Sequence, residues 1–328
     1  LDCYTAPGQD GCPIHQEIPT YVALAGEGKY EEALKVILNR NALPFMTGTI
    51  CSHPCQGYCT RNFYEKSVQI RNTKLECAEQ AMDAIIDSVS VTGDYSGSVA
   101  VVGGGPAGMA AAYYLARLGA KVTIYEKRER LGGVVSAIIP NFRIDVIAKD
   151  AALLEKLGVK VLYNTEAPAV DVLKKEYDSV ILAVGAYKRG ELKLEGGEAQ
   201  NALAFLEDYN RTNGKMAIGK NVVVIGGGNT AMDTARAAKR CDGVEHVYLV
   251  YRRTKRYMPA DEHELVLAVE DGVEFRELLA PEKLENGQLI CRVMKLGELD
   301  ASGRAGIVET DETVAVPADR VIAAVGEK

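Results

Sequence analysis

The sequence predicts an α/β protein in which a helical N-terminal domain precedes two Rossmann-like dinucleotide-binding domains, the second inserted into the first. Three observations predict this fold class. Apolar residues recur at helical spacing in the first 95 residues, a glycine-rich turn twice follows a short buried strand, and the phrase at 178–185 returns nearly unchanged at 319–326. We therefore expect domains at 1–95, 96–190 and 191–318, with 319–328 beginning the return to the first Rossmann-like domain.

Two helices are expected in the N-terminal domain. The segment Tyr30–Leu38 has helical composition and spacing. A second helix is predicted by one apolar stripe with alternating steps of three and four residues, formed by Leu75, Ala78, Met82, Ile85 and Val89. The polar, glycine-containing stretch 92–98 then indicates a linker.

The first glycine-rich turn lies between an expected strand at 99–102 and an expected helix at 107–118. Gly103 permits the tight turn, Gly105 lets the backbone approach a pyrophosphate, and Gly108 lets the helix pack closely on the strand. A second strand at 121–125 ends at Glu126, where a carboxylate can bind ribose hydroxyls. The alternative is a glycine-rich turn that binds nothing.

The second turn follows the apolar run at 222–225 and has Ala231 in place of the third glycine, which still allows close packing. The next expected strand, 246–250, runs into Tyr251-Arg252-Arg253. A carboxylate there would repel a 2′-phosphate, whereas a guanidinium binds it with two hydrogen bonds. The pattern therefore favours NADP over NAD, and the alternative is a solvated basic loop.

The composition narrows the function classes. The chain has 328 residues, a net charge of −7 and a pI near 5.4, which argues against nucleic-acid binding. No apolar run is long enough to span a bilayer and no signal peptide is present, so we expect a cytoplasmic protein without a membrane partner. Because residue 1 is Leu, we expect a fragment or a processed chain.

Cysteines are concentrated near the N-terminus. Five of the eight lie in the first 59 residues, and without an export signal such a group favours metal binding over disulfides. Cys51, Cys55 and Cys59 are spaced by four, but Pro54 and Gly57 favour an irregular loop over a helix. Both an iron–sulfur cluster and a structural zinc ion are compatible with these thiols.

Four segments together carry a resemblance to a known family: the motif at 12–19 (CPIHQEIP), the motif at 51–59 (CSHPCQGYC), the motif at 226–233 (GGGNTAMD), and Tyr251-Arg252-Arg253 followed by Met258-Pro259. The chain resembles the small subunit of bacterial glutamate synthase and the N-terminal part of dihydropyrimidine dehydrogenase, and most nearly the flavin module of selenate reductase-type iron–sulfur oxidoreductases. The resemblance implies that NADPH or NADH reduces FAD and that [4Fe–4S] clusters exchange single electrons with a catalytic partner subunit or domain.

The same resemblance implies the binding residues of both nucleotides. It places FAD in the domain at 96–190, contacted by Gly103, Gly105, Ala107, Glu126 and Gly133. It places NADPH in the domain at 191–318, contacted by Gly228, Asn229, Thr230, Arg252 and Arg253. No catalytic acid or base is expected, because the cofactors do the chemistry once the protein aligns their rings and excludes water.

The resemblance also implies the cluster ligands in the helical iron–sulfur domain at 1–95. One cluster would take Cys12, Cys51 and Cys55, with Glu76 preferred over the neighbouring Cys77 as fourth ligand. A second cluster would use Cys3 and Cys59, but position 8 is Gly8 and the remaining position precedes the chain. This cluster is therefore lost, or completed from outside the chain, or the printed sequence skips residues.

Three functions remain open from the sequence. The first is an electron-transfer enzyme that passes electrons from NADPH through FAD and a cluster to a partner. The second is a disulfide reductase of the thioredoxin-reductase type, which needs a redox dithiol, whereas Cys241 and Cys291 are single. The third is a non-catalytic subunit that binds nucleotides without turnover.

Overall fold

The computed structural model describes residues 6–141, 146–185, 192–301 and 303–325. The chain divides into two compact units, one formed by Leu1–Ser136 and Phe142–Gly185 and the other by Ala137–Asn141 and Ala186–Lys328. Each unit is described by itself.

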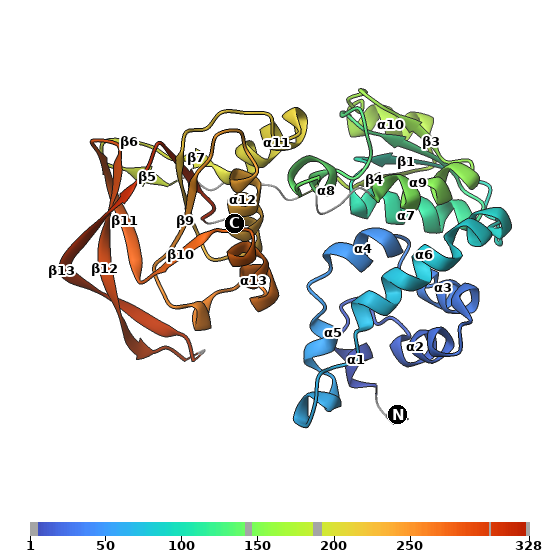
Figure 1. Ribbon diagram of the computed structural model, residues 1–328. Coiled ribbons are helices and arrows are strands. Elements are labelled where there is room, and N and C mark those ends of the chain that lie inside the picture. The colour runs from blue at the N-terminus through green and yellow to red at the C-terminus, as the bar shows by residue number, and fades with distance from the viewer. Residues whose placement is uncertain (1–5, 142–145, 186–191, 302, 326–328) are drawn as a thin grey trace. The chain divides into compact units, whose positions relative to one another are not determined.

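The first unit begins with short helices (Figure 1): α1 (Pro7–Asp10), α2 (Ile18–Gly26), α3 (Tyr30–Leu38), α4 (Pro44–Ile50), α5 (Pro54–Gly57), the 3₁₀ turn η1 (Thr60–Phe63) and the long α6 (Ile70–Ser88). Proline stands in the first turn of α1, α2, α4 and α5, where its missing N–H has no helical partner to lose. Helix α3 packs on α6, whose predicted apolar stripe is buried at Ala78, Met82 and Ile85 and half-buried at Leu75, while Val89 is the C-terminal cap residue.

The expected loop at 51–59 is only partly observed. Residues 54–57 form the helical turn α5, and η1 follows directly after Cys59. The prediction of a loop treats Pro54 as a helix breaker, but proline is favourable at the first position of a helix, and Pro54 begins α5 there.

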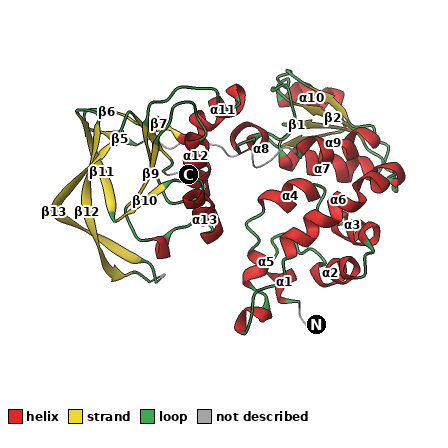
Figure 2. Ribbon diagram, viewed as in Figure 1, coloured by secondary structure: helices red, strands yellow, loops and turns green. Residues whose placement is uncertain are grey.

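The remainder of the first unit is a four-stranded parallel sheet of order β3-β2-β1-β4. Its strands are β1 (Ser98–Val102), β2 (Lys121–Tyr125), β3 (Lys160–Leu162) and β4 (Ser179–Leu182). Its helices are α7 (Pro106–Arg117), α9 (Ile147–Lys156) and α10 (Val170–Glu176), and α8 (Val134–Ile138) spans the division, since Ala137 and Ile138 belong to the second unit. In Figure 2, α7 and α9 lie on one face of this sheet and α10 lies on the other.

Helix α9 also joins the sheet to the N-terminal helices. The buried Asp150 carboxylate accepts the amide hydrogens of Phe45, at 3.1 Å, and of Met46, at 2.8 Å. These two amides lie in the first turn of α4, where no helical partner exists for them, so Asp150 supplies one from another element.

The second unit is built on a five-stranded sheet of order β10-β9-β8-β14-β7 and a three-stranded antiparallel sheet. The first contains β7 (Gln200–Asn201), β8 (Asn221–Ile225), β9 (His246–Tyr251), β10 (Glu274–Glu277) and β14 (Arg320–Ala323). The second contains β11 (Leu279–Glu285), β12 (Gln288–Leu299) and β13 (Ala305–Pro317), and β5 (Lys193–Leu194) pairs with β6 (Gly197–Glu198). The helices are α11 (Ala202–Thr212), α12 (Asn229–Lys239), the 3₁₀ turn η2 (Lys255–Tyr257) and α13 (Glu262–Glu270).

Alternation along β8 decides what covers each face of the five-stranded sheet. Val222 and Val224 pack with α11, α12 and α13, whereas Val223 and Ile225 pack with the three-stranded sheet. Successive side chains of a strand point to opposite faces, so an all-apolar strand must be covered on both sides. The three-stranded sheet is the second cover, and no local sequence pattern predicts it.

The repeated phrase at 178–185 and 319–326 corresponds to matching strands. Strand β4 lies beside β1 in one sheet, and β14 lies beside β8 in the other, in the same parallel sense. The sequence predicts that 319–328 begin the return to the first Rossmann-like domain. Strand β14 instead pairs with β8, so the described residues 319–325 belong to the second unit. Among the described residues, no segment after Gly185 is grouped with the first unit, so the insertion of one domain into the other remains a prediction.

No helix in the described part of the chain combines the length and the apolar character needed to cross a membrane.

Candidate functional site

The first glycine-rich turn needs glycine for steric reasons at two positions. Gly103 has φ +104°, and a Cβ there would lie 2.5 Å from the carbonyl oxygen of Ala183. A Cβ on Gly108 would lie 1.9 Å from the carbonyl oxygen of Gly103. The turn between β1 and α7 therefore forms only because both side chains are absent.

Predicted FAD contacts gather at the start of α7. Glu126 is 4% exposed, and its two carboxylate oxygens accept the amide hydrogens of Gly104 and Arg128, both at 2.8 Å. The backbones of Gly105 and Gly133 pass so closely that a Cβ on Gly133 would lie 2.8 Å from the Gly105 Cα. Ala107 lies exposed in the first turn of α7.

This arrangement fits a flavin dinucleotide. The cap residue Gly105 offers no side-chain acceptor to the first amides of α7, so these donors and the helix dipole remain available to a pyrophosphate. A carboxylate accepts about four hydrogen bonds, so Glu126 retains capacity for ribose hydroxyls. The five assigned contacts remain proposals.

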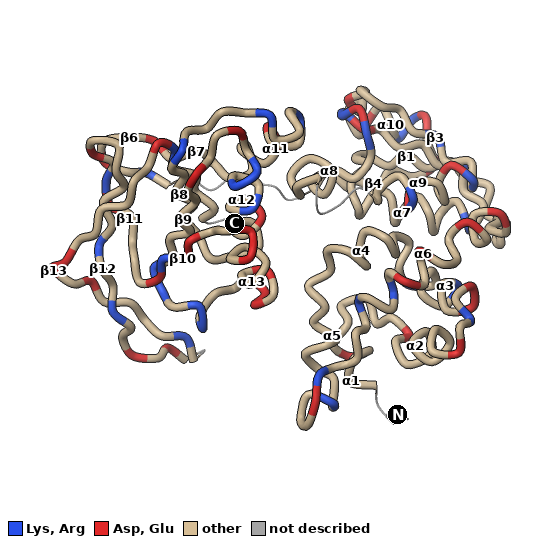
Figure 3. The backbone as a smooth tube through the Cα atoms, in the orientation of Figure 1, with Lys and Arg blue, Asp and Glu red and all other residues tan. Residues whose placement is uncertain are grey.

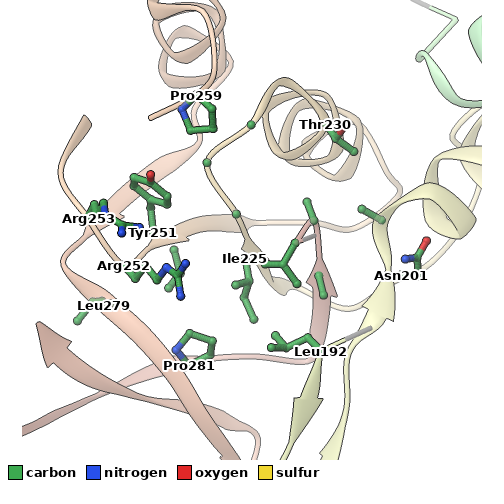
Figure 4. A pocket seen from close by; sticks show the side chains of 18 of the residues that line it. Leu192, Asn201, Ile225, Thr230, Tyr251, Arg252, Arg253, Pro259, Leu279 and Pro281 are labelled. Carbon is green, nitrogen blue, oxygen red and sulfur yellow. The ribbon is translucent and has the colours of Figure 1, made fainter. Parts of the chain in front are cut away.

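The second glycine-rich turn lines a cavity of about 640 Å³ (Figure 4). Gly228, Thr230, Arg252 and Arg253 all line it, so four of the five predicted NADPH contacts share one space. Asn229 does not line it, and its side-chain oxygen instead accepts the amide hydrogen of Asp261 at 3.0 Å, at the start of α13. Gly228 leaves the first amides of α12 without a side-chain cap.

The two turns differ in charge at the same structural position. Glu126 directly follows Tyr125, the last residue of β2, and Arg252 directly follows Tyr251, the last residue of β9. Figure 3 shows Lys and Arg in the segment after β9. The first site therefore suits a ribose with free hydroxyls, and the second suits a ribose phosphate.

Sequence reasoning missed a third arginine at the second site. Arg304 lies between β12 and β13, lines the cavity, and donates from Nη2 to the Tyr251 hydroxyl at 3.3 Å. Beside it, Arg253 Nε donates to the Ala305 carbonyl oxygen at 3.0 Å. No local motif marks Arg304, because it reaches the cavity only through the pairing of the three-stranded sheet.

Three of the predicted metal ligands lie together in the first unit. Cys12 and Cys55 are buried and Cys51 is half-buried. Burial, followed by the charges of Cys51 and Cys12 beside it, raises the pKa of the Cys55 thiol to about 11. Such a group of thiols binds protons tightly unless positive charge, such as iron, offsets the thiolates.

Hydrogen-bond donors face two of these sulfurs. Gln16 Nε2 donates to Cys12 Sγ at 3.6 Å, and the His53 amide donates to Cys51 Sγ at 3.4 Å. Gln16 is itself held by Asn41, whose Nδ2 donates to Gln16 Oε1 at 3.2 Å, and both side chains are buried. Donors of this kind stabilise metal-bound thiolates.

A buried hydroxyl lies in the same region without a partner. Tyr21 is fully buried, and its oxygen has no hydrogen-bond partner among the described residues. After burial itself, the nearby thiols of Cys55 and Cys12 are the largest causes that raise its pKa. An orphaned donor beside these thiols fits a cluster, whose sulfides accept hydrogen bonds.

The structure does not gather all the predicted ligands. Glu76 is exposed and accepts a hydrogen bond from the Tyr30 hydroxyl at 2.9 Å, while the alternative Cys77 is fully buried. Cys59 is half-buried after α5, Cys3 lies outside the described residues, and Gly8 lies against the backbone of Cys55. Within the described ranges, no three Cys, His, Asp or Glu side chains lie close enough together to hold one metal ion.

Comparison with known proteins gives the family. The model of the pyridine nucleotide-disulphide oxidoreductase family matches residues 97–328, and that of dihydropyrimidine dehydrogenase domain II with a 4Fe-4S cluster matches residues 1–85. Together the two matches imply FAD, NAD(P) and a 4Fe–4S cluster as cofactors.

Three curated relatives extend this result. The chain is 45% identical over its whole length to the oxidoreductase YgfK of Escherichia coli K12, of which it covers 32%. It is 36% identical over its whole length to NADPH-Fe(3+) oxidoreductase subunit beta of Geobacter sulfurreducens strain PCA, of which it covers 52%. It is 34% identical over 96% of its length to the glutamate synthase [NADPH] small chain of Escherichia coli K12, of which it covers 72%.

The chain thus spans about a third of the first of these relatives and about half of the second. The family match covers more than half of the chain, and the likeness to the glutamate synthase small chain covers most of both proteins. The resemblance stated from the motifs is confirmed: the chain belongs to the pyridine nucleotide-disulphide oxidoreductase family, in the group that includes the glutamate synthase small chain.

Proposed function

We propose that this chain is an electron-transfer oxidoreductase module that takes electrons from NADPH through FAD to a [4Fe–4S] cluster and delivers them to a partner subunit or domain. The observation that carries the proposal is the presence of two glycine-rich turns in one chain. The strand after the first turn is followed by a buried carboxylate, and the strand after the second is followed by a pair of arginines. When bound, the nicotinamide supplies a hydride, the flavin accepts it, and the cluster carries single electrons onward.

The protein's part in this reaction is binding and orientation. The open amides of α7 and α12 hold pyrophosphates, and Glu126 binds the ribose of the first nucleotide. Arg252, Arg253 and Arg304 surround the 2′-phosphate of the second and select NADPH over NADH. No side chain needs to donate or accept a proton.

The partner is proposed from the names of the relatives. Two of them are a subunit beta and a small chain, names that imply a further subunit in each enzyme. We infer that this chain likewise supplies electrons to a catalytic centre on another subunit or domain. Its substrate is set by that centre.

The test is chemical analysis followed by anaerobic reduction. Anaerobically purified protein should contain FAD, iron and sulfide, and NADPH should bleach the flavin absorbance and then produce the paramagnetic signal of a reduced cluster. Protein that contains zinc and no iron removes the cluster step. Protein that binds NADPH and FAD without reduction of the flavin supports the non-catalytic alternative.

A further inference from the structure

The first two turns of α6 lie against the Cys51–Cys55 segment. Arg71 Nη1 donates to the carbonyl oxygen of Cys51 at 3.0 Å, and the Arg71 amide donates to Gln56 Oε1 at 3.0 Å. Helix α4, which ends next to Cys51, also packs on α6, where Gly48 meets Leu75 with no room for a Cβ. The Cys51–Cys55 segment is therefore held against the start of α6 by the hydrogen bonds of Arg71 and by the packing of α4 on α6.

Lys74 lies one turn after Arg71 and is only 3% exposed. Its side chain interacts electrostatically with the thiols of Cys51, Cys55 and Cys12, and these three thiols, together with Cys77, also act on Tyr21. A lysine is almost never this buried without an anionic partner. Asp150 also interacts electrostatically with Lys74, and its two oxygens accept the amide hydrogens of Phe45 and Met46, so the lysine faces one carboxyl group and three thiols.

Glu76 cannot take this place on the same helix turn. Two residues along an α-helix differ by about 200° in direction, so Lys74 and Glu76 point to nearly opposite sides. Glu76 is exposed and bonded to Tyr30, whereas Lys74 is enclosed with the thiols. The pocket therefore contains three thiols, one lysine and the unpartnered hydroxyl of Tyr21. Cys77 also acts on Tyr21, but burial and the charge of Glu76 raise the pKa of Cys77, with no contribution from the other three thiols.

We propose that Lys74, and not Glu76, is the fourth side chain of the Cys12–Cys51–Cys55 pocket, so that the cluster has three thiolate ligands and its fourth corner faces the lysine ammonium group. This rests on the proposed function, because it presumes that the pocket holds a [4Fe–4S] cluster. Lys74 offsets thiolate charge and donates to the cluster, and the Tyr21 hydroxyl is a second donor. Nearby positive charge and hydrogen bonds to sulfur both stabilise the reduced cluster and raise its reduction potential.

The first test compares potentials in cluster-loaded variants of the whole chain. Lys74→Met should lower the midpoint potential of the cluster, and Tyr21→Phe should shift it in the same direction by less. Glu76→Gln should leave it unchanged, as should Lys29→Met, whose lysine is exposed and paired with Glu27. A potential that responds to Glu76→Gln and not to Lys74→Met would overturn the proposal.

The second test uses the missing fourth thiolate. Mild oxidation of the wild-type cluster with ferricyanide should remove the iron that no cysteine holds and give the paramagnetic signal of a three-iron cluster. Lys74→Cys supplies a fourth thiolate and should suppress this conversion. A wild-type cluster that resists conversion as well as Lys74→Cys does would contradict the three-thiolate assignment.

A third measurement needs no variant and so survives any folding defect. Wild-type protein labelled with ¹⁵N-lysine should show coupling of a lysine nitrogen to the spin of the reduced cluster in pulsed EPR, and absence of coupling ends the proposal. The two levels of inference are separable. Wild-type protein without iron and sulfide refutes the cluster step of the proposed function, whereas a cluster indifferent to Lys74 refutes this assignment alone.

Discussion

A single residue after the second strand of each Rossmann-like domain distinguishes the two nucleotide sites. Glu126 is buried and its carboxylate accepts the amide hydrogen of Gly104, which fixes the carboxylate at the proposed ribose position. Arg252 lines an open cavity with Arg253 and Arg304, so positive charge gathers there. The sequence predicts Glu126, Arg252 and Arg253 at these positions. It does not predict Arg304, which lies between β12 and β13, far along the chain from Arg252.

Removing the first two guanidinium groups should change nucleotide preference. Replacement of Arg252 and Arg253 together by Ala should lower kcat/KM for NADPH about 10- to 100-fold, since charge-assisted hydrogen bonds contribute about 1.5–3 kcal/mol. The value for NADH should change by less than about threefold. Steady-state kinetics with both nucleotides measure this, and Arg276→Ala, at an exposed arginine paired with Glu274, is the matched control. Equal losses for both nucleotides would show that the arginines do not read the phosphate.

The close contact of Gly108 with Gly103 predicts a stability effect at the first site. Gly108→Ala should lower the free energy of unfolding by about 1–3 kcal/mol, because its Cβ would overlap a backbone oxygen that cannot move away. It should also release FAD. Gly26→Ala is the control, since that position is open and at the end of a helix, so stability should stay equal or rise by up to about 1 kcal/mol. Thermal unfolding of both variants measures these effects. A Gly108→Ala variant as stable as wild type would contradict the close contact of Gly108 with Gly103.

At the scale of elements, pattern alone predicted the parts built from local sequence. Strands β1, β2, β8 and β9 and helix α3 lie within a residue or two of their predicted positions, whereas α6 begins at Ile70, five residues before the first residue of its predicted stripe. The three-stranded sheet was not predicted. The apolar residues of β8 indicate that both faces of the strand are covered, but they do not indicate which element covers the second face. The burial of Lys74 was not predicted for a related reason. Sequence spacing shows which residues share a face of α6, but the burial of Lys74 depends on the Cys51–Cys55 segment that packs over the helix.

The C-terminal ends of α12 and α13 are joined by one acidic residue. Asp271 accepts hydrogen bonds from Arg236 Nε at 2.6 Å and from Arg240 Nη1 at 2.7 Å. Burial acts to raise the pKa of Asp271, but these two arginines outweigh it and lower the pKa. A carboxyl group with a lowered pKa in the folded state contributes stability above its ordinary pKa of about 4, and that contribution is lost as the pH falls through the folded value.

Asp271→Asn should therefore destabilise the protein at neutral pH by about 1–2 kcal/mol, a range reduced for partial solvent exposure. The difference from wild type should vanish under acid conditions. Denaturant unfolding across the pH range measures both effects. Glu245→Gln breaks an exposed ion pair with Lys220 and should change stability little. A similar loss of stability in both variants would contradict the stabilising role of Asp271 at the ends of α12 and α13.

At the scale of the whole chain, the two sheets share one strand order, β3-β2-β1-β4 and β10-β9-β8-β14. The internal repeat predicted this correspondence. The fold class and the family follow from the sequence, whereas the ligand assignments remain proposals, because motifs identify a binding turn and not the group that fills it. The number of clusters depends in part on Cys3, which lies outside the described residues.

The arrangement of thiols argues against a disulfide reductase. Cys241 and Cys291 are buried on opposite faces of the five-stranded sheet, and burial raises the pKa of each to about 12. Neither can serve as a nucleophilic thiolate at neutral pH. Alkylation of the folded, cluster-loaded protein should therefore leave the rate of flavin reduction by NADPH unchanged in rapid-mixing experiments. Loss of that reduction after alkylation would restore the disulfide-reductase hypothesis.

The central claim is that one chain binds two nucleotides at separate sites of opposite charge. It is tested most directly by measuring FAD content and NADP⁺ affinity in two variants, Glu126→Gln and the double replacement of Arg252 and Arg253 by Ala. The account predicts that the first variant loses FAD and keeps NADP⁺ affinity, while the second keeps FAD and loses NADP⁺ affinity. Affinities that fall together in both variants, or that change in neither, would contradict it.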